Sequence, residues 1–151
     1  MIKNYFFLII LVFLAQCGYK PIYSQNNQNF EIKNIELNRN KNNKILETRL
    51  SNYKIKNEPI YFYDLKIETS ENKSILSKNT QGEAVLLRIK ISLKLEVFEK
   101  EKLMIEKKYF EQFDYKSISR KFELTNYENE IRVEMYNELI AKILMDLTNL
   151  K

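Results

Sequence analysis

Residues 87–97 alternate strictly between apolar and polar side chains, which is the clearest pattern in the chain. A period of two over this length predicts a strand with one buried face and one face open to water. The polar positions Arg88, Lys90 and Lys94 should share the open face. The apolar positions, which should face the core, are Leu87, Ile89, Ile91, Leu93, Leu95 and Val97.

Weaker strand patterns lie on both sides of this segment. Residues 30–37 and 60–68 are rich in aromatic and branched apolar side chains and predict two further strands. Residues 103–113 follow a polar turn at 99–102, and the short connection predicts an antiparallel partner for residues 87–97. The segments 69–83 and 115–125 are expected to be irregular connections.

Two segments have helical periodicity. Residues 45–53 place apolar side chains on one side of a helix that Asn42 or Asn43 can cap and that Pro59 ends. The last helix should begin near Thr125, because Thr125 and Glu128 have the spacing of a capping box. Its apolar stripe consists of Ile131, Met135, Leu139, Ile140, Ile143, Leu144 and Leu147. Another face carries Glu130, Glu134 and Glu138, expected as a solvated flank with support from a Glu138–Lys142 pair.

The predicted order is strand, helix, strand, strand, strand, helix. Two amphipathic helices can cover one apolar sheet face, so the order predicts an α+β fold. We expect a two-layer sandwich with two helices packed on one face of a four-stranded, mostly antiparallel sheet. The opposite face, which carries Arg88 and Lys90, would be open to solvent or offered to a partner.

The start of the chain has the features of an export signal. Residues 5–14 are unbroken apolar sequence, about half of the roughly twenty residues that a membrane-spanning helix needs. Leu14 lies three positions ahead of Cys17, the sole cysteine, which resembles a bacterial lipobox, although Gln16 occupies a position where a small residue is usual. We expect residues 1–16 to be a signal peptide, 17–29 a lipidated N-terminus and tether, and 30–151 a single domain. An ordinary signal peptide and an uncleaved signal anchor stay open as alternatives.

Composition excludes several functional classes. The net charge of +5 is modest and dispersed, which argues against nucleic acid as a partner. The chain has no histidine and two glycines, so it offers no usual zinc site, no His-assisted nucleophile and no glycine-rich phosphate loop. We therefore expect no metal, no cofactor and no enzymatic activity. A small hydrolase would have to rely on a carboxylate pair or an activated lysine.

Three stretches resemble one known family. The motif Cys17-Gly18-Tyr19-Lys20-Pro21-Ile22-Tyr23, the loop at 78–84 and the helix at 126–136 are similar to those of LptE, the lipopolysaccharide-assembly lipoprotein of the Gram-negative outer membrane, in its alphaproteobacterial form. The resemblance implies a periplasm-facing, lipid-anchored protein of the outer membrane without catalytic activity. It would plug and help assemble the β-barrel LptD and assist lipopolysaccharide insertion into the outer leaflet.

The resemblance also implies where lipopolysaccharide would bind. Lys78 occupies the position of a basic loop residue that is implicated in the family, whereas a second basic position aligns with Leu124, with Arg120 and Lys121 just upstream. Arg88 and Lys90 are further candidates, because Lys and Arg bind anionic phosphates. A second hypothesis is an accessory lipoprotein of a lipid transporter, or a pilot of a secretin.

Overall fold

The computed structural model describes residues 30–38, 40, 42–53 and 60–150. The predicted signal peptide at 1–16, the tether at 17–29 and the lipid anchor at Cys17 lie outside these residues. The described part contains the strand β1 (Phe30–Leu37), the helix α2 (Asn43–Ser51), the strands β2 (Tyr61–Lys78), β3 (Ala84–Glu99) and β4 (Lys102–Lys116), and the helix α3 (Lys121–Asn149).

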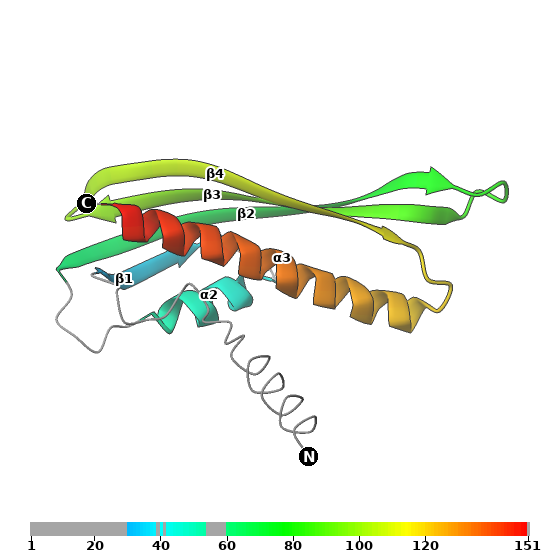
Figure 1. The fold of residues 1–151 in the computed structure, drawn as a ribbon, viewed down its shortest axis with the longest axis horizontal. Helices are drawn as coiled ribbons and strands as arrows, with labels where there is room; N and C mark the ends of the chain where they lie inside the picture. Colours follow the sequence, from blue (N-terminus) through cyan, green and yellow to red (C-terminus); the bar gives the residue numbers. More distant parts are fainter. Residues whose placement is uncertain (1–29, 39, 41, 54–59, 151) are drawn as a thin grey trace, which may run out of the picture.

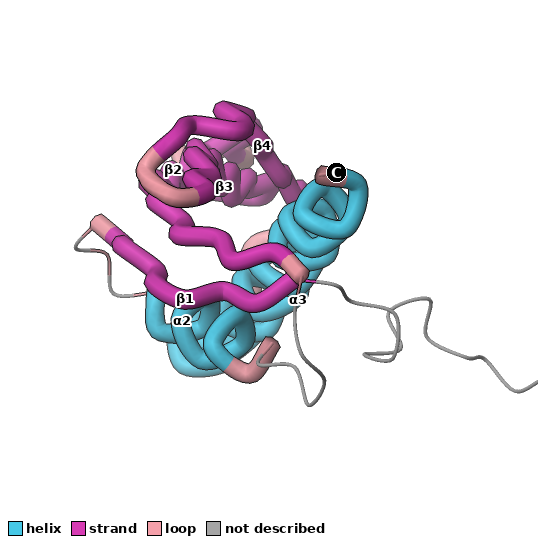
Figure 2. Tube along the Cα trace, turned by 90° about the vertical axis from the view of Figure 1, so that its left-hand side faces the viewer, coloured by secondary structure: helices cyan, strands magenta, loops and turns pink. Residues whose placement is uncertain are grey.

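The α+β prediction is confirmed. One sheet has the strand order β1-β2-β3-β4, and α2 and α3 lie on the same side of it, as Figure 1 shows. The β2–β3 and β3–β4 pairs are antiparallel, whereas β1 pairs with β2 in parallel, with α2 between them in the chain. The sheet curls strongly, so that β4 comes beside α3 when the molecule is viewed along its long axis (Figure 2).

The core lies between the sheet and the two helices. The six apolar residues predicted to face inward on β3 are all at most 4% exposed, so the assigned strand faces are confirmed. The predicted stripe of α3 is buried as well, together with Tyr136. Leu46 and Leu50 of α2 are fully buried beside Phe30 of β1. Burial of about twenty apolar side chains is the dominant source of stability for such a layered domain.

Three predicted boundaries are wrong. β2 does not end at residue 68 but continues to Lys78, because Glu71 and Lys73 face the inner side and pair with α3. The connection at 115–125 is mostly regular structure, since β4 runs to Lys116 and α3 begins at Lys121. Glu128 therefore lies two turns inside α3 and does not form a capping box.

The cap predicted for α2 is also different in detail. Asn42 is the N-cap residue, but its side chain makes no capping hydrogen bond and instead donates from Nδ2 to Glu71 Oε2 at 2.8 Å. Asn43 is buried and donates to the Asn38 carbonyl at 2.6 Å, while it accepts a 2.6 Å hydrogen bond from the hydroxyl of Thr69. These polar contacts attach the start of α2 to the middle of β2.

Candidate functional site

The first predicted site residue, Lys78, lies at the last position of β2, opposite Ala84 across the β2–β3 hairpin. Its side chain is exposed. The loop that follows is held by Asn79, whose Oδ1 accepts hydrogen bonds from the backbone N–H groups of Gln81 at 3.0 Å and Glu83 at 2.8 Å. Gly82 has a φ of +83°, which favours glycine over other residues. The hairpin thus presents Lys78 from a loop of defined conformation.

Several apolar side chains near this end of the hairpin are exposed to solvent. Ile75, Leu76 and Val85 are between 40% and 51% exposed, although they belong to long, well-paired strands. Phe122, in the first turn of α3, is 77% exposed. These four side chains leave apolar surface that the described part of the chain does not bury. Sequence reasoning missed these residues, because Ile75, Leu76 and Phe122 lie in the segments 69–83 and 115–125, which were expected to be irregular connections.

Arg120 and Lys121 lie where the chain enters α3. Arg120 precedes the helix and pairs through Nη1 with Glu123 Oε1 at 2.9 Å, while the exposed Lys121 has no partner among the described residues. Cations at a helix N-terminus oppose the positive end of the helix dipole, so helix stability does not explain them. Leu124, at the aligned position of the second basic residue, is partly buried against the core.

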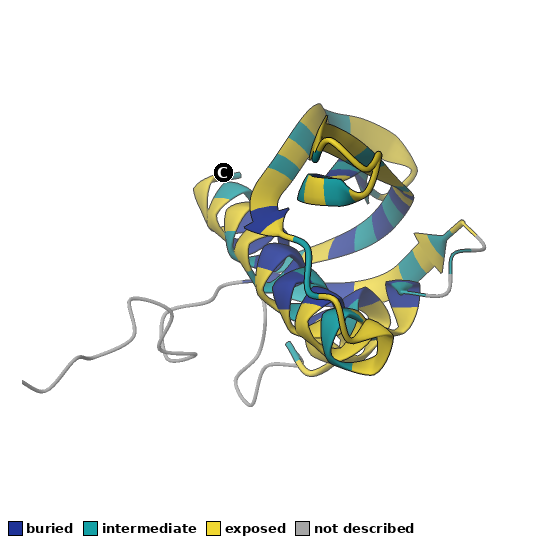
Figure 3. Ribbon diagram, turned by 90° about the vertical axis from the view of Figure 1, so that its right-hand side faces the viewer, coloured by how far each residue is buried: buried dark blue, intermediate teal, exposed yellow. Residues whose placement is uncertain are grey.

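The structure brings three of the five basic candidates to one end of the molecule. The tip of the β2–β3 hairpin and the start of α3 both lie at the end opposite the C-terminus (Figure 1), and Figure 3 views this end directly. We call the basic residues Lys78, Arg120 and Lys121, with the exposed apolar residues Ile75, Leu76, Val85 and Phe122, the distal end. Its chemistry suits an amphiphile that carries negative charge and hydrocarbon.

The other two candidates lie on the sheet face away from the helices, where Arg88 pairs with Ser74, next to Ile75 of the distal end. Arg88 makes a two-pronged ion pair with Asp114, with Nε–Oδ1 at 2.6 Å and Nη2–Oδ2 at 2.8 Å. The hydrogen bond from Arg88 holds the pKa of Asp114 below its usual range. Because this carboxylate already occupies the guanidinium, Arg88 is a poor phosphate ligand.

Lys90 has a different environment on the same face. Its Nζ lies 5.4 Å from the centre of the Phe110 ring, and Phe110 is itself exposed. A shallow hollow of about 410 Å³ adjoins this pair and is bordered by Lys94 and Lys108. Lys94 is engaged by Glu96 at 2.5 Å and Glu106 at 3.1 Å. Lys90 and Lys108 therefore remain as the available cations of this hollow.

A polar cluster connects the hairpin arm to α3. Glu128, which is 7% exposed, accepts a hydrogen bond from the Tyr115 hydroxyl at 2.7 Å and pairs with Lys73. Arg132 donates from Nε to Glu71 Oε1 at 2.6 Å and lies 3.5 Å from Glu128 Oε2. This cluster fixes β2 against the N-terminal half of α3, on which the geometry of the distal end depends.

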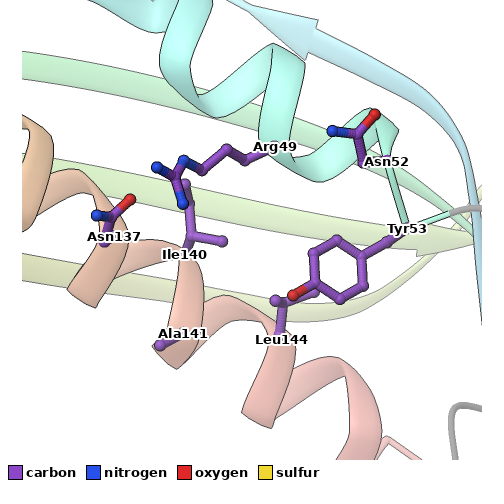
Figure 4. Close-up of a pocket in the computed structure, with 7 residues that line it drawn as sticks. All are labelled: Arg49, Asn52, Tyr53, Asn137, Ile140, Ala141 and Leu144. Carbon is purple, nitrogen blue, oxygen red and sulfur yellow. The ribbon is translucent and has the colours of Figure 1, made fainter. Parts of the chain in front are cut away.

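One pocket lies between the helices. Figure 4 shows it between α2 and α3, with a volume of about 310 Å³ and seven lining residues. Arg49 is the single ionisable cation of that lining, and Ile140 and Leu144 form its apolar side. Asn137 contributes a buried Oδ1 that has no hydrogen-bond partner in the part of the chain that the structure describes. This lining combines polar and apolar side chains, but its seven residues include no pair of groups suited to proton transfer.

Within residues 30–38, 40, 42–53 and 60–150, no cluster of three or more Cys, Asp or Glu side chains is placed to hold a metal ion. Across the same residues, no helix combines the length and apolar character that a membrane crossing requires.

Comparison with known proteins gives a likeness of fold. No family model matches the chain, and no curated protein matches its sequence. Among solved structures, the chain is similar to rare lipoprotein B from Shewanella oneidensis, with 17% identity and a TM-score of 0.59 over 78% of this chain and 95% of that one. It is similar to a minor lipoprotein from Acinetobacter baumannii, with 11% identity and a TM-score of 0.59 over 79% and 91%.

A further similar structure is lipoprotein B from Nitrosomonas europaea. The identity is 14% and the TM-score 0.61, over 87% of this chain and 90% of that chain. Because these identities are low, the comparisons establish a shared fold and leave function to be argued from the chain itself. The chain thus has the fold seen in these bacterial lipoproteins.

Proposed function

We propose that this chain is a lipoprotein of the outer membrane, anchored through Cys17 and facing the periplasm. In this role it plugs and helps assemble an LptD-type β-barrel and assists the insertion of lipopolysaccharide into the outer leaflet. It acts by binding and catalyses no reaction. The resemblance of three sequence stretches to LptE supports this proposal, as does the fold shared with structures that are described as lipoproteins.

One observation carries the lipid part of the proposal. The distal end gathers exposed cations and exposed apolar side chains, with Phe122 at 77% exposure beside Lys121 in the chain. Lipopolysaccharide combines phosphate groups with acyl chains, so it can satisfy both kinds of side chain at once. Lys78 and Lys121 would contact phosphates, while Ile75, Val85 and Phe122 would contact hydrocarbon.

The structure also refines the list of candidate ligands. Lys78 and Lys121 have no ion-pair partner within the described residues, whereas Arg120 is shared with Glu123 and Arg88 with Asp114. We therefore rank Lys78 and Lys121 first and Arg88 last. Lys90 lies on the sheet face away from the helices. A ligand bound there would make a contact separate from that at the distal end.

The test is the variant Lys78→Glu, with lipopolysaccharide affinity measured at low and high salt. We expect a loss of roughly tenfold or more at low salt, because a charge-assisted hydrogen bond contributes about 1.5–3 kcal/mol. The loss should shrink at high salt, since exposed charges are screened beyond about 8–10 Å. Lys44→Glu on α2 is the matched control, because Lys44 is exposed and far from the distal end.

Copurification in mild detergent separates the partner hypotheses. Recovery of a barrel of the lipopolysaccharide-assembly type, retained by Lys78→Glu, supports the proposal. Recovery of a lipid transporter or a secretin supports the alternative, in which the chain is an accessory or pilot lipoprotein. Unchanged lipopolysaccharide affinity of Lys78→Glu at low salt would remove Lys78 from the site.

A further inference from the structure

A groove between β4 and the middle of α3 differs from the distal end in chemistry. Its volume is about 440 Å³, and its floor is apolar, with Ile131 and Met135 of α3 nearly buried beneath it. Phe113 reaches into it from β4 and is 44% exposed. A half-exposed aromatic ring beside this apolar floor leaves apolar surface for a partner to bury.

Three glutamates of α3 line the rim of this groove. Glu130, Glu134 and Glu138 are exposed and follow one another at intervals of four residues, so they lie on one side of the helix. None of them has an ion pair or a hydrogen bond in the described part of the chain. The predicted Glu138–Lys142 pair is wrong, because Lys142 reaches across to Glu111 of β4.

This row of charge is unfavourable for the isolated chain. Like charges four residues apart destabilise a helix, and no cation of the described residues forms an ion pair with any of the three. The negative charge of this row is also opposite in sign to the net charge of +5 of the whole chain. Charge complementarity therefore points to a cationic partner.

The groove continues to one edge of the sheet. β4 is the last strand of the sheet, and among the described residues it pairs with β3 alone. The groove is lined by the consecutive residues Glu111, Gln112 and Phe113. Since consecutive strand side chains point to opposite faces, such a lining means that the groove reaches the edge of the strand. Backbone groups at an exposed edge are a template for another strand.

The spacing of the glutamates fits an added strand. Every second residue of a strand advances about 6.6–6.8 Å, and four residues of a helix advance about 6 Å. α3 and β4 both extend along the long axis of the molecule (Figure 1), and Figure 2 shows β4 beside α3. Alternate side chains of a strand on β4 would therefore meet the three glutamates in turn.

We propose that this groove binds an extended segment of a partner protein with Lys or Arg at every second position, which adds to the sheet beside β4. The aliphatic stems of these side chains cover Phe113, and their charged heads reach Glu130, Glu134 and Glu138. The inference rests on the groove and not on the proposed lipid role, so either can fail without the other.

The test uses a synthetic peptide with four Thr-Lys repeats and a fluorescent label. Its binding to the full chain in zwitterionic detergent is followed by fluorescence anisotropy. The triple variant Glu130→Gln, Glu134→Gln, Glu138→Gln should weaken binding by roughly tenfold or more, since it removes the charged partner of several contacts. A peptide of Thr-Glu repeats should not bind.

A matched control removes the same charge elsewhere. Glu36, Glu47 and Glu101 are exposed glutamates on β1, α2 and the β3–β4 turn, and none has an ion-pair partner among the described residues. Their triple change to Gln should leave peptide affinity within about twofold, because these charges lie away from the groove. Both triple variants should keep the lipopolysaccharide affinity of the unchanged chain.

Backbone amide exchange supplies the position of the bound peptide. Exchange at residues 111–113 should slow when the peptide binds, because an added strand protects edge amides. Absence of peptide binding, equal losses in both triple variants, or binding without protection of β4 would each overturn the inference. Equally tight binding of a helix-forming peptide of the same charge would also overturn it.

Discussion

Tyr115 of β4 donates a 2.7 Å hydrogen bond from its hydroxyl to Oε1 of Glu128 on α3. The same carboxylate is paired with Lys73 of β2, so one buried acidic group connects two strands to a helix. Burial of a carboxylate is unfavourable unless such partners are present. The relationship has direct consequences for stability.

The first prediction concerns the Tyr115 hydroxyl. Tyr115→Phe should lower the free energy of unfolding by about 1.5–3 kcal/mol, the usual contribution of a hydrogen bond to a charged group. Urea denaturation measures the change. Tyr127→Phe is the control, because the Tyr127 ring packs edge-on against Tyr115 but its hydroxyl has no partner among the described residues. Equal losses in the two variants would contradict a specific role for the Tyr115–Glu128 bond.

The second prediction concerns the free energy of unfolding at acidic pH. Burial acts to raise the pKa of Glu128, but the hydrogen bonds from Lys73 and Tyr115 outweigh it and lower that pKa in the folded state. A lowered pKa means that Glu128 contributes stability above its unfolded value of about 4.3, and that this contribution is lost as the pH falls through the folded value. Unfolding free energy should therefore drop below about pH 5.

The variant Glu128→Gln isolates this effect. The pKa values of Asp114 and Glu96 are also lowered, by hydrogen bonds from Arg88 and Lys94, so some acid sensitivity should remain. We expect a shallower slope of unfolding free energy against pH for Glu128→Gln between about pH 3 and 5. A slope identical to that of the unchanged chain would show that Glu128 titrates normally.

The third prediction compares two neighbours on β3. Leu93 is 1% exposed, so Leu93→Ala should cost about 2–5 kcal/mol through lost burial and a residual cavity. Lys94 points to the open face, where it pairs with Glu96 and Glu106, and Lys94→Ala should cost at most about 1 kcal/mol. Chemical denaturation of both variants measures the difference. Comparable losses would contradict the assigned strand faces.

The fourth prediction concerns the β3–β4 turn. Glu99 pairs with Lys102, and the two residues between them, Lys100 and Glu101, have φ values of 47° and 68°. A two-residue turn of this kind favours Asn-Gly, and each other residue there costs about 1–2 kcal/mol. Lys100→Asn combined with Glu101→Gly should raise the thermal midpoint. Glu99→Gly, within the strand, should lower it.

Much of the fold could be predicted from the sequence where the pattern is repeated and apolar. β3 alternates over its whole central length, and its burial follows that alternation residue by residue. The stripe of α3 was equally clear. An element that buries one face against the core has apolar side chains at a regular period, and this period can be recognised in the sequence.

The second half of β2 could not be predicted for the opposite reason. Its inner positions hold Thr69, Glu71 and Lys73, which are polar because their partners on α2 and α3 are polar too. A strand whose buried side is matched by ion pairs shows no apolar alternation. The partner of Thr69 lies 26 positions away in the chain, and the α3 partners of Lys73 and Glu71 lie 55 and 61 positions away, so local pattern cannot reveal them.

The candidate site was predicted in part. Lys78 was named from the position of its loop, and the structure places it on an exposed hairpin tip, which the sequence alone could not establish. Arg88 is neutralised by Asp114, a partner that becomes visible only when the register of β3 and β4 is known. The exposure of Phe122 and the groove beside Phe113 depend on which turns of α3 the sheet covers. This coverage is set only when the sheet and the helix pack together, so the sequence alone does not reveal it.

The parallel pairing of β1 with β2 has a consequence for the order of folding. β2, β3 and β4 are joined by tight hairpins and can associate soon after they are made, whereas Phe30 must find Tyr61 across an intervening helix. Contacts between distant residues form late, because closing a longer loop loses more chain entropy. The strand that leaves the ribosome first is therefore expected to join the sheet last. Its apolar residues, Phe30 and Ile32, then stay exposed to other binders until β2, β3 and β4 have been made and paired.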